Sequence, residues 1–227
     1  MEMVCMSLSD AMLNRKSIRG YKPDRVPQDI LRQVIGLAIE SPSASNAQPW
    51  ELAVLTGAPL EELNRITVDL WEKGAPGNPD VAPADLSGDY MRRRKEVGKQ
   101  VFKLLGIQRE DYAARKDWNR KALRFFDAPV GIIICTDASL ERSRTDFDLG
   151  IMTEALCLAA MCFGLGTCID QQAISYPEAI RQVTGLAESK RITAAVSIGY
   201  PDWEFPANKL ESSREAVDVV ASWHGFE

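Results

Sequence analysis

The chain has 227 residues, 45% of them apolar, and a formal net charge of −5. This length and composition can bury one large core, and the acidic balance argues against nucleic-acid binding through a broad basic face. No apolar run approaches the roughly 20 residues that cross a bilayer, so we expect no membrane span.

The first part of the chain is predicted to contain short helices around one strand. Residues 9–14 are expected to form a helix, and apolar positions recur with helical spacing over 27–40, between two prolines. Residues 51–56 are predicted to form a strand, and Pro59 opens a further helix. The binding motifs described below lie in the connections between these elements.

Glycine and proline interrupt the pattern between residues 71 and 89. We predict a long loop there, which is either a lid or binding segment or a disordered excursion. Two charged helices are expected to follow, at about 89–105 and 109–126. The segment 71–126 is thus interpreted as an insertion that selects the substrate.

The second half of the chain is more apolar. Residues 130–135 are largely β-branched, which predicts a buried strand. Residues 146–163 are apolar on almost every face, which is typical of a core helix, and we expect this helix also to pack against a second subunit. A capping-box sequence at Ser175 predicts another helix, ended by Gly185, and a strand is expected at 192–199.

Cysteine and histidine usage limits the chemistry further. The five cysteines are Cys5, Cys135, Cys157, Cys162 and Cys168. Their odd number and the lack of a Cys-x-x-Cys pair favour buried free thiols in a reducing compartment over a disulfide framework or a metal site. No secretory signal pattern opens the chain, so we expect a cytoplasmic protein. A Ser-His-Asp triad would depend on His224, the single histidine.

A basic segment near the N-terminus suits a phosphate group. Arg15, Ser17 and Arg19 are two residues apart, so an extended backbone would aim them the same way, and Lys16 adds a further cation. Guanidinium groups bind phosphate oxygens in bidentate fashion, and a hydroxyl adds a hydrogen bond. The alternative is a solvated basic patch.

A second motif occupies residues 41–50, between a predicted helix and a predicted strand. It combines hydroxyl and amide side chains with two prolines and an indole. Loops held between rigid elements often carry binding groups, and proline reduces the entropy lost on binding. A flat heterocycle with polar edges would suit this surface, and an ordinary turn with capping residues is the alternative.

Together, the two motifs resemble the nitroreductase family of FMN-dependent oxidoreductases. The family pattern is Arg-x-Ser-x-Arg, followed about one helix later by a Ser/Asn-rich loop that ends in Gln-Pro-Trp. Further matches lie at 125–130, 164–168, 199–202 and 208–214, so the resemblance spans nearly the whole chain. It implies an α+β fold with a mixed, mostly antiparallel sheet flanked by helices.

The same resemblance implies a single FMN-binding domain over residues 1–227 and a homodimer with its FMN sites at the interface. An arm from about residue 200, including 215–223, would cross to the partner subunit. Arg15 and Ser17 match positions that hold the FMN phosphate, and Lys16 lies between them. Arg19 matches a position that reaches the ribityl chain or the pyrimidine edge.

The resemblance also assigns cofactor roles farther along the chain. Arg214 matches an arginine that returns to the phosphate, whereas Ser212 replaces a second basic residue. The loop residues that match contacts to the partner's flavin, or lie among them, are Pro42, Ser43, Ala44 and Asn46, and Ala44 replaces a serine there. Gln48 and Trp50 are interpreted as stabilising the loop.

The turn that lies along the flavin is matched by Thr167, Cys168, Ile169 and Asp170, whose backbone N–H groups would hydrogen-bond the flavin N5 region. We interpret Cys168 as a bystander because no partner cysteine is near in sequence. The residues considered for the substrate site are Tyr90, Arg92, Tyr112 and Trp118. Helix surface or local packing is the alternative for each of these four.

No side-chain redox centre and no dinucleotide-binding glycine motif is present, so redox chemistry would need an organic cofactor. The resemblance implies FMN, with NADH or NADPH as donor, in a ping-pong hydride transfer to nitroaromatic or quinone-like acceptors. One alternative is a reductase of the same fold that acts on enones or carbon–halogen bonds. Another is a flavin-binding or sensing protein without turnover.

Overall fold

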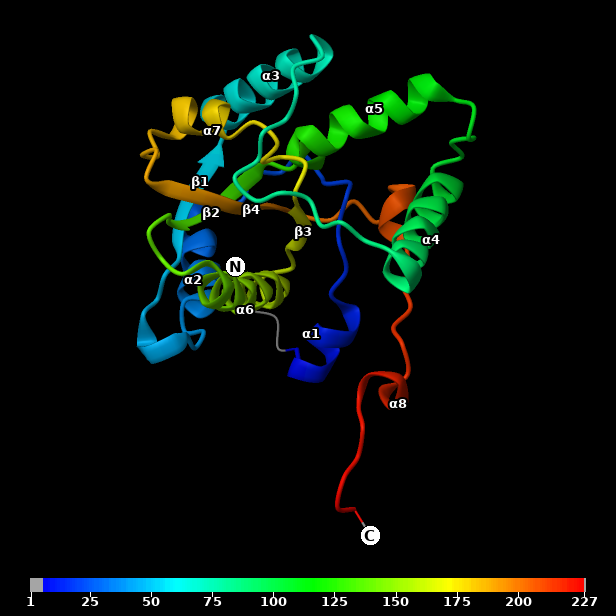
Figure 1. Ribbon diagram of the computed structural model, residues 1–227. Coiled ribbons are helices and arrows are strands. Elements are labelled where there is room, and N and C mark those ends of the chain that lie inside the picture. Colours follow the sequence, from blue (N-terminus) through cyan, green and yellow to red (C-terminus); the bar gives the residue numbers. More distant parts are fainter. Residues whose placement is uncertain (1–5, 227) are drawn as a thin grey trace.

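The computed structural model describes residues 6–226, and a four-stranded antiparallel sheet lies at its centre (Figure 1). The strand order is β1-β2-β4-β3, and each neighbouring pair runs antiparallel. In chain order the elements are α1 (Leu8–Asn14), α2 (Gln28–Ala38), η1 (Ala44–Asn46), β1 (Glu51–Thr56), α3 (Ala58–Glu72), α4 (Gly88–Leu104), α5 (Tyr112–Leu123), η2 (Phe125–Asp127), β2 (Val130–Asp137), α6 (Arg142–Met161), β3 (Gly166–Asp170), α7 (Pro177–Thr184), β4 (Lys190–Gly199), η3 (Pro206–Lys209) and α8 (Val217–Val220). The predicted α+β fold, with a mostly antiparallel sheet flanked by helices, is confirmed, and the helices cover both faces of the sheet.

The central strand β2 is buried on both faces. Ile132 and Ile134 pack against α2 and α6, whereas Ile133 and Cys135 pack against α3 and α7. Successive side chains of a strand point to opposite faces, so an uninterrupted apolar run is what a three-layer arrangement requires. Each fully buried aliphatic side chain contributes roughly 1.5–3 kcal/mol.

Two helix starts differ from the prediction. α6 begins at Arg142 instead of 146, because the Glu141 carboxylate accepts hydrogen bonds from the N–H groups of Ser143 (3.0 Å) and Arg144 (2.9 Å). The capping box predicted at Ser175 is wrong. The Ser175 hydroxyl donates to a preceding carbonyl, and α7 starts at Pro177 without a side-chain cap. The predicted end of α7 at Gly185, with φ 74°, is confirmed.

The edge strand β3 corrects the expected turn along 167–170. The turn is completed at Gly164 (φ 68°), and residues from Gly166 onward pair with β4. On its other side, β3 meets the N-terminal segment through an isolated bridge between Ser17 and Thr167. A Cβ at Gly166 would lie 2.5 Å from Cγ1 of Ile18, so only glycine permits this approach. β3 therefore connects the N-terminal segment to the sheet, with β4 on its other side.

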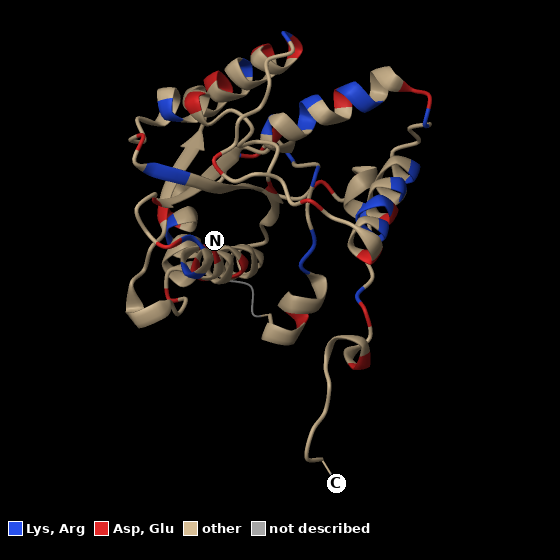
Figure 2. Ribbon diagram, in the orientation of Figure 1, with Lys and Arg blue, Asp and Glu red and all other residues tan. Residues whose placement is uncertain are grey.

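α4 and α5 project beside the layered body, and the chain leaves that body at its C-terminal end through α8 (Figure 1). Lys and Arg are concentrated along α4 (Figure 2). The loop between α3 and α4 is tied down by Asp80, whose Oδ2 accepts from Arg181 Nη2 (2.7 Å) and from the Ile192 N–H (2.8 Å). The role of the insertion 71–126 as a lid or selectivity element stays a prediction.

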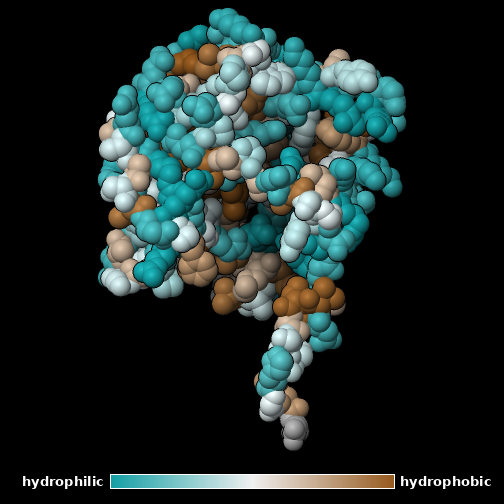
Figure 3. Space-filling view, viewed as in Figure 1, coloured by the Kyte–Doolittle hydropathy of each residue, from teal (hydrophilic) through white to brown (hydrophobic). Residues whose placement is uncertain are grey.

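Apolar side chains remain uncovered at two places near the chain ends. Figure 3 shows brown surface where the C-terminal segment leaves the body. The exposed large apolar residues of α1 and of the C-terminal segment are Leu8, Met12, Leu13, Val217, Val219, Val220, Trp223 and Phe226. Within residues 6–226, no helix is long and apolar enough to cross a membrane.

Candidate active site

The basic segment is held against the edge of the sheet by backbone hydrogen bonds. Ile18, 2% exposed, donates its N–H to the Thr167 carbonyl at 2.8 Å. The next N–H, that of Arg19, donates to Asn208 Oδ1 at 2.7 Å. The Asn208 Nδ2 in turn donates to the carbonyls of Gly20 and Asp202, both at 2.7 Å. Asn208 opens the 208–214 match, but its role in positioning Arg19 was not predicted from the sequence.

The cations of this segment diverge. Arg15 ends α1 and pairs with Glu154 of α6 (Nε–Oε1 3.1 Å), and it lines a cavity of about 200 Å³ together with Lys16. Arg19 instead lies 6.0 Å from the centroid of the Phe126 ring. The prediction that the side chains of Arg15, Ser17 and Arg19 all point the same way therefore holds only in part, because hydrogen bonds anchor the segment on both sides.

Asp170 ends β3 as a buried carboxyl. It is 5% exposed, and its Oδ1 accepts from the Gln172 N–H at 2.9 Å. Its buried Oδ2 has no hydrogen-bond partner among the described residues. Burial raises the pKa of Asp170 to about 7, against the opposing effects of the backbone N–H groups of Gln172 and Ala173 and of the Arg19 charge. An unpartnered polar atom of this kind marks a place where a ligand would add a hydrogen bond.

The Cys168 thiol is a poor nucleophile. Burial raises the pKa of its thiol to about 12, against the opposing charge of Arg19, so the nucleophilic thiolate is disfavoured. The four cysteines among the described residues are free thiols. Beside Cys168, Ile169 is 43% exposed and lines a cavity of about 280 Å³ with Gly150 and Thr153 of α6.

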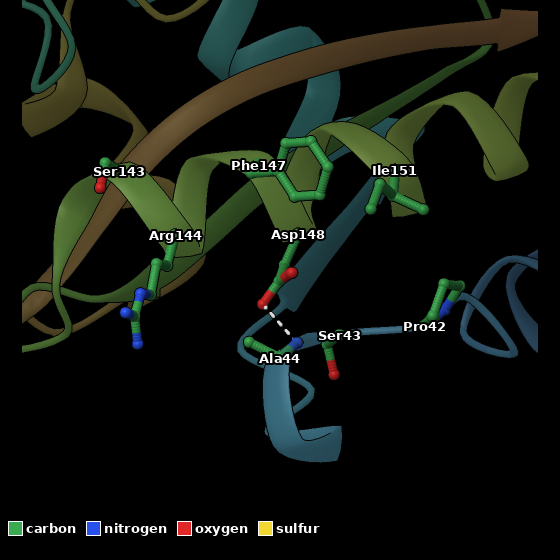
Figure 4. A pocket seen from close by; sticks show the side chains of 8 residues that line it. All are labelled: Pro42, Ser43, Ala44, Ser143, Arg144, Phe147, Asp148 and Ile151. Carbon is green, nitrogen blue, oxygen red and sulfur yellow. Dashed lines mark hydrogen bonds between the residues drawn. The ribbon is translucent and has the colours of Figure 1, made fainter. Parts of the chain in front are cut away.

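The polar loop lines a separate, larger cavity of about 590 Å³, which we call the loop cavity (Figure 4). Its walls are Pro42, Ser43 and Ala44 on one side and the first half of α6 on the other. The Ala44 N–H donates to Asp148 Oδ2 at 3.1 Å, which fixes the loop on the helix. Phe147, the neighbour of Asp148 on α6, is exposed and also lines this cavity (Figure 4).

The loop itself is strained. Ser45, Asn46 and Gln48 have φ of 54°, 58° and 48°, in the left-handed backbone region that residues other than glycine rarely adopt. Internal hydrogen bonds hold it: the Gln48 N–H donates to Ser43 Oγ at 2.9 Å, and its Nε2 donates to the Asn46 carbonyl at 3.2 Å. Such strain occurs often at ligand clamps. Gln48 here contacts the loop, and Trp50 packs half-buried against the core.

The two predicted cofactor segments meet different faces of α6. Arg15 contacts Glu154, whereas Ala44 contacts Asp148, six positions earlier. Six residues correspond to ~9 Å along a helix and to about 120° around its axis, at about 100° per residue. Within one chain the basic segment and the polar loop therefore do not line a common cavity.

The four substrate-site candidates are also dispersed. Trp118 is partly buried and packs on Phe126, with the ring centroids 5.5 Å apart, and Phe126 belongs to a small buried cluster with Cys168. Tyr90 and Tyr112 are 66% and 79% exposed on α4 and α5. Arg92 and Arg214, for which different roles were expected, line one further cavity of about 200 Å³.

Phe126 has φ 55°, between two neighbours that also have positive φ. The motif Phe125–Asp127 was visible in the sequence, but its strained turn and its contact with Arg19 were not. Among the described residues, no group of three or more His, Cys, Asp or Glu side chains could hold a metal ion.

A cationic segment pinned to an edge strand, beside a buried carboxyl with an unsatisfied oxygen, is an arrangement that could hold an anionic small molecule. The sequence model for the nitroreductase family matches residues 12–200. The chain belongs to the nitroreductase family, as the motifs predicted.

Individual relatives align with this chain along most of their length. A 4-nitrobenzoate reductase of Pseudomonas putida is 29% identical over 215 residues, covering 94% of each chain. A 4-nitrobenzoate reductase of a Nocardioides species is 30% identical over 209 residues, covering 90% of this chain and 84% of the relative. The crystal structure of the FMN-dependent nitroreductase NfnB from Mycobacterium smegmatis in complex with NADPH is similar at a TM-score of 0.90 and 26% identity, covering 95% and 97% of the chains.

Proposed function

We propose that this chain is an FMN-dependent oxidoreductase that oxidises NADH or NADPH and reduces nitroaromatic compounds. The observation that carries the proposal is the basic segment Arg15–Arg19 pinned along β3, next to the buried carboxyl of Asp170. The relatives support it, because two of them are named 4-nitrobenzoate reductases and a third is titled FMN-dependent and was solved with NADPH.

The residues present fit FMN. Arg15 and Lys16 line one cavity and would bind the phosphate, with the Ser17 hydroxyl adding a donor. Arg19 and the unsatisfied Oδ2 of Asp170 would contact the polar edge of the ring system. When bound, FMN would accept hydride from the nicotinamide donor and pass it to the acceptor, which is chemistry that no side chain here supplies.

Arg19 would stabilise negative charge that develops on the reduced cofactor, because the hydrogen bond from its backbone N–H to Asn208 Oδ1 fixes the backbone that carries the guanidinium and so limits reorganisation. Trp118 and Phe126 would provide an aromatic wall on the same side. The buried thiol of Cys168 would stay protonated and take no part. One open stacking surface would serve donor and acceptor in turn, in the order that a ping-pong reaction requires.

A homodimer would complete the site. In one chain the loop cavity and the Arg15 cavity are separate, so the loop residues Pro42, Ser43 and Asn46 would serve the cofactor of the partner subunit. The uncovered apolar residues of α1 and of the C-terminal segment support such an assembly, since exposed apolar patches are typical of interfaces. The arm from about residue 200 would cross to the partner.

The test is spectroscopic. The purified protein should show bound flavin, which NADH or NADPH should bleach without oxygen and which 4-nitrobenzoate should then reoxidise. Failure to bleach with either donor would favour a flavin-binding protein without turnover. Reoxidation by an enone or a halogenated phenol but not by 4-nitrobenzoate or a quinone would favour the alternative reductases. Protein that takes up no FMN would overturn the proposal.

A further inference from the structure

The carboxyl group at the end of β3 has an oxygen for which the fold provides no partner. Asp170 is 5% exposed, and its Oδ1 accepts from the Gln172 N–H at 2.9 Å. Its Oδ2 is buried and has no hydrogen-bond partner in the part of the chain that the structure describes. Burial penalises the charged form of such a group, and groups perturbed in this way cluster at functional sites. The charge or the proton of Asp170 is therefore a candidate for use in the reaction.

Asp170 lies on the same face of β3 as Cys168. Successive side chains of a strand point to opposite faces, so these two point one way and Ile169 points the other. Cys168 belongs to a small buried cluster with Phe126 of η2, and Tyr21 packs against this cluster. Arg19 lies 6.0 Å from the centroid of the Phe126 ring. The ionisable groups that face Asp170 are thus one cation, one thiol and one phenol.

The thiol and the phenol do not titrate near neutral pH. Burial raises the pKa of the Tyr21 hydroxyl well above its ordinary value and that of the Cys168 thiol to about 12, so both stay protonated. Arginine keeps its charge throughout this range. Burial raises the pKa of Asp170 to about 7, against the opposing effects of two backbone N–H groups and of the Arg19 charge. A change of charge nearby would therefore change how much of Asp170 is protonated.

The free edge of β3 runs past Asp170. The Thr167 carbonyl points away from β4, because it accepts the Ile18 N–H at 2.8 Å. Backbone groups two residues apart in a strand point the same way, so Ile169 directs its own N–H and carbonyl to this edge. Neighbouring Cα atoms are about 3.8 Å apart, so a ligand bound at Ile169 would lie close to Asp170. Negative charge on that ligand would act on the buried carboxyl with little screening by solvent.

We propose that Asp170 is a redox-linked proton acceptor, which takes up a proton from solvent when two electrons reach bound FMN and releases it when the acceptor removes them. This inference rests on the proposed function, because that function supplies the cofactor and both electron partners. Asp170 would then balance part of the negative charge that arrives with the electrons, and Arg19 would balance the rest.

Protons and electrons balance over one cycle. NADH or NADPH supplies a hydride, which is two electrons and one proton, and solvent supplies a second proton to the Asp170 carboxylate. Reduction of a nitro group to a nitroso group consumes two electrons and two protons and releases water. Asp170 returns to the carboxylate as the acceptor is reduced.

The test is spectroelectrochemistry of the FMN-loaded protein, since an electrode delivers electrons without a nicotinamide donor. The midpoint potential is measured as a function of pH for wild type, Asp170→Asn and the control Asp85→Asn, which removes the same charge from an exposed loop. Each proton bound per two electrons lowers the potential by about 30 mV per pH unit. Infrared difference spectra of reduced minus oxidised protein report the carbonyl stretch of a newly protonated carboxyl.

Between pH ~7 and 8.5, wild type and Asp85→Asn should lose about 60 mV per pH unit and show the carboxyl band. Asp170→Asn should lose about 30 mV per pH unit and lack the band. At pH ~5.5 the band should disappear from wild type, because Asp170 is already protonated before reduction. Equal slopes in wild type and Asp170→Asn, or no band in wild type above neutral pH, would overturn the inference.

The same experiment separates this inference from the proposed function. Protein that shows the expected slopes and band but is not bleached by NADH or NADPH would refute the proposed reaction and leave the role of Asp170 standing. Protein that is bleached by a donor but shows equal slopes would do the reverse. Protein that takes up no FMN would overturn both.

Discussion

Replacing Asp170 by asparagine tests whether a buried, partly unsatisfied carboxyl destabilises the folded chain at neutral pH. Asparagine has nearly the same shape, and its Oδ1 can still accept the Gln172 N–H that now bonds Asp170 at 2.9 Å. The substitution removes the charge and puts an amide NH₂ group in the place of Oδ2. Because Oδ2 is buried without a partner among the described residues, the ionised form is poorly compensated.

The sign and size of the expected stability change follow from the pKa of Asp170. Burial raises the pKa of Asp170 to about 7 from its ordinary 3.8, so between these values the folded state binds more protons than the unfolded state. Stability from this group therefore falls as pH rises through that window and is lowest above pH ~7. Each pKa unit is worth about 1.4 kcal/mol, so Asp170→Asn should be more stable than wild type by up to about 4 kcal/mol at pH 8 and by little at pH ~4.

The assay is urea unfolding of flavin-depleted protein at several pH values between ~4 and 8, at one protein concentration. The exposed loop residue Asp85 provides the control, since Asp85→Asn removes the same charge outside the core. The free-energy difference between Asp170→Asn and wild type should widen steadily with pH. A difference that does not change with pH would refute the reasoning, because a purely steric effect has no proton linkage.

Three further predictions concern the cofactor, the packing and the assembly. Arg15→Ala should weaken FMN binding by about 1.5–3 kcal/mol through loss of a charge-assisted bond, with riboflavin little affected; equal losses in both flavin titrations would contradict the phosphate role. Gly166→Ala should lower the free energy of unfolding by about 1–3 kcal/mol, because its Cβ would lie 2.5 Å from Ile18. Gly98→Ala is the control on α4: nothing described lies within 4 Å of its Cβ, so it should raise the free energy of unfolding by about 0.5–1 kcal/mol. Both changes are measured from the midpoints of urea unfolding. The thermal midpoint should rise with protein concentration if the site is shared between copies, and a flavin-loaded monomer in sedimentation would argue against the dimer.

Local pattern predicted most elements but not every boundary. The expected helices at 89–105 and 109–126 correspond to α4 and α5 within a few residues, since charge and helical spacing are local signals. The start of α6 was missed because its first turn is polar and depends on the Glu141 side chain. β3 was missed because a five-residue edge strand is defined by its partner β4, which no local pattern reveals.

The same distinction, between local sequence signals and contacts with distant residues, separates the site residues that were predicted from those that were missed. Arg15, Ser17 and Arg19 are recognisable because the motif is contiguous. Asn208, which orients Arg19 from 189 positions away, has no local signal. Phe126 was part of a noted motif, but its positive φ and its approach to Arg19 arise only from the packing of η2 beside the sheet.

α6 explains how one helix could organise two halves of a shared site. Asp148 anchors the polar loop and Glu154 anchors Arg15, and their separation by six positions turns the two anchors to different faces of the helix. The two anchors lie ~9 Å apart along α6 and about 120° apart around its axis, and the two segments line separate cavities of one chain. Two copies placed face to face would let the loop cavity of one chain meet the Arg15 cavity of the other. The positions of Asp148 and Glu154 on α6 are therefore a structural reason to expect a site built from two subunits.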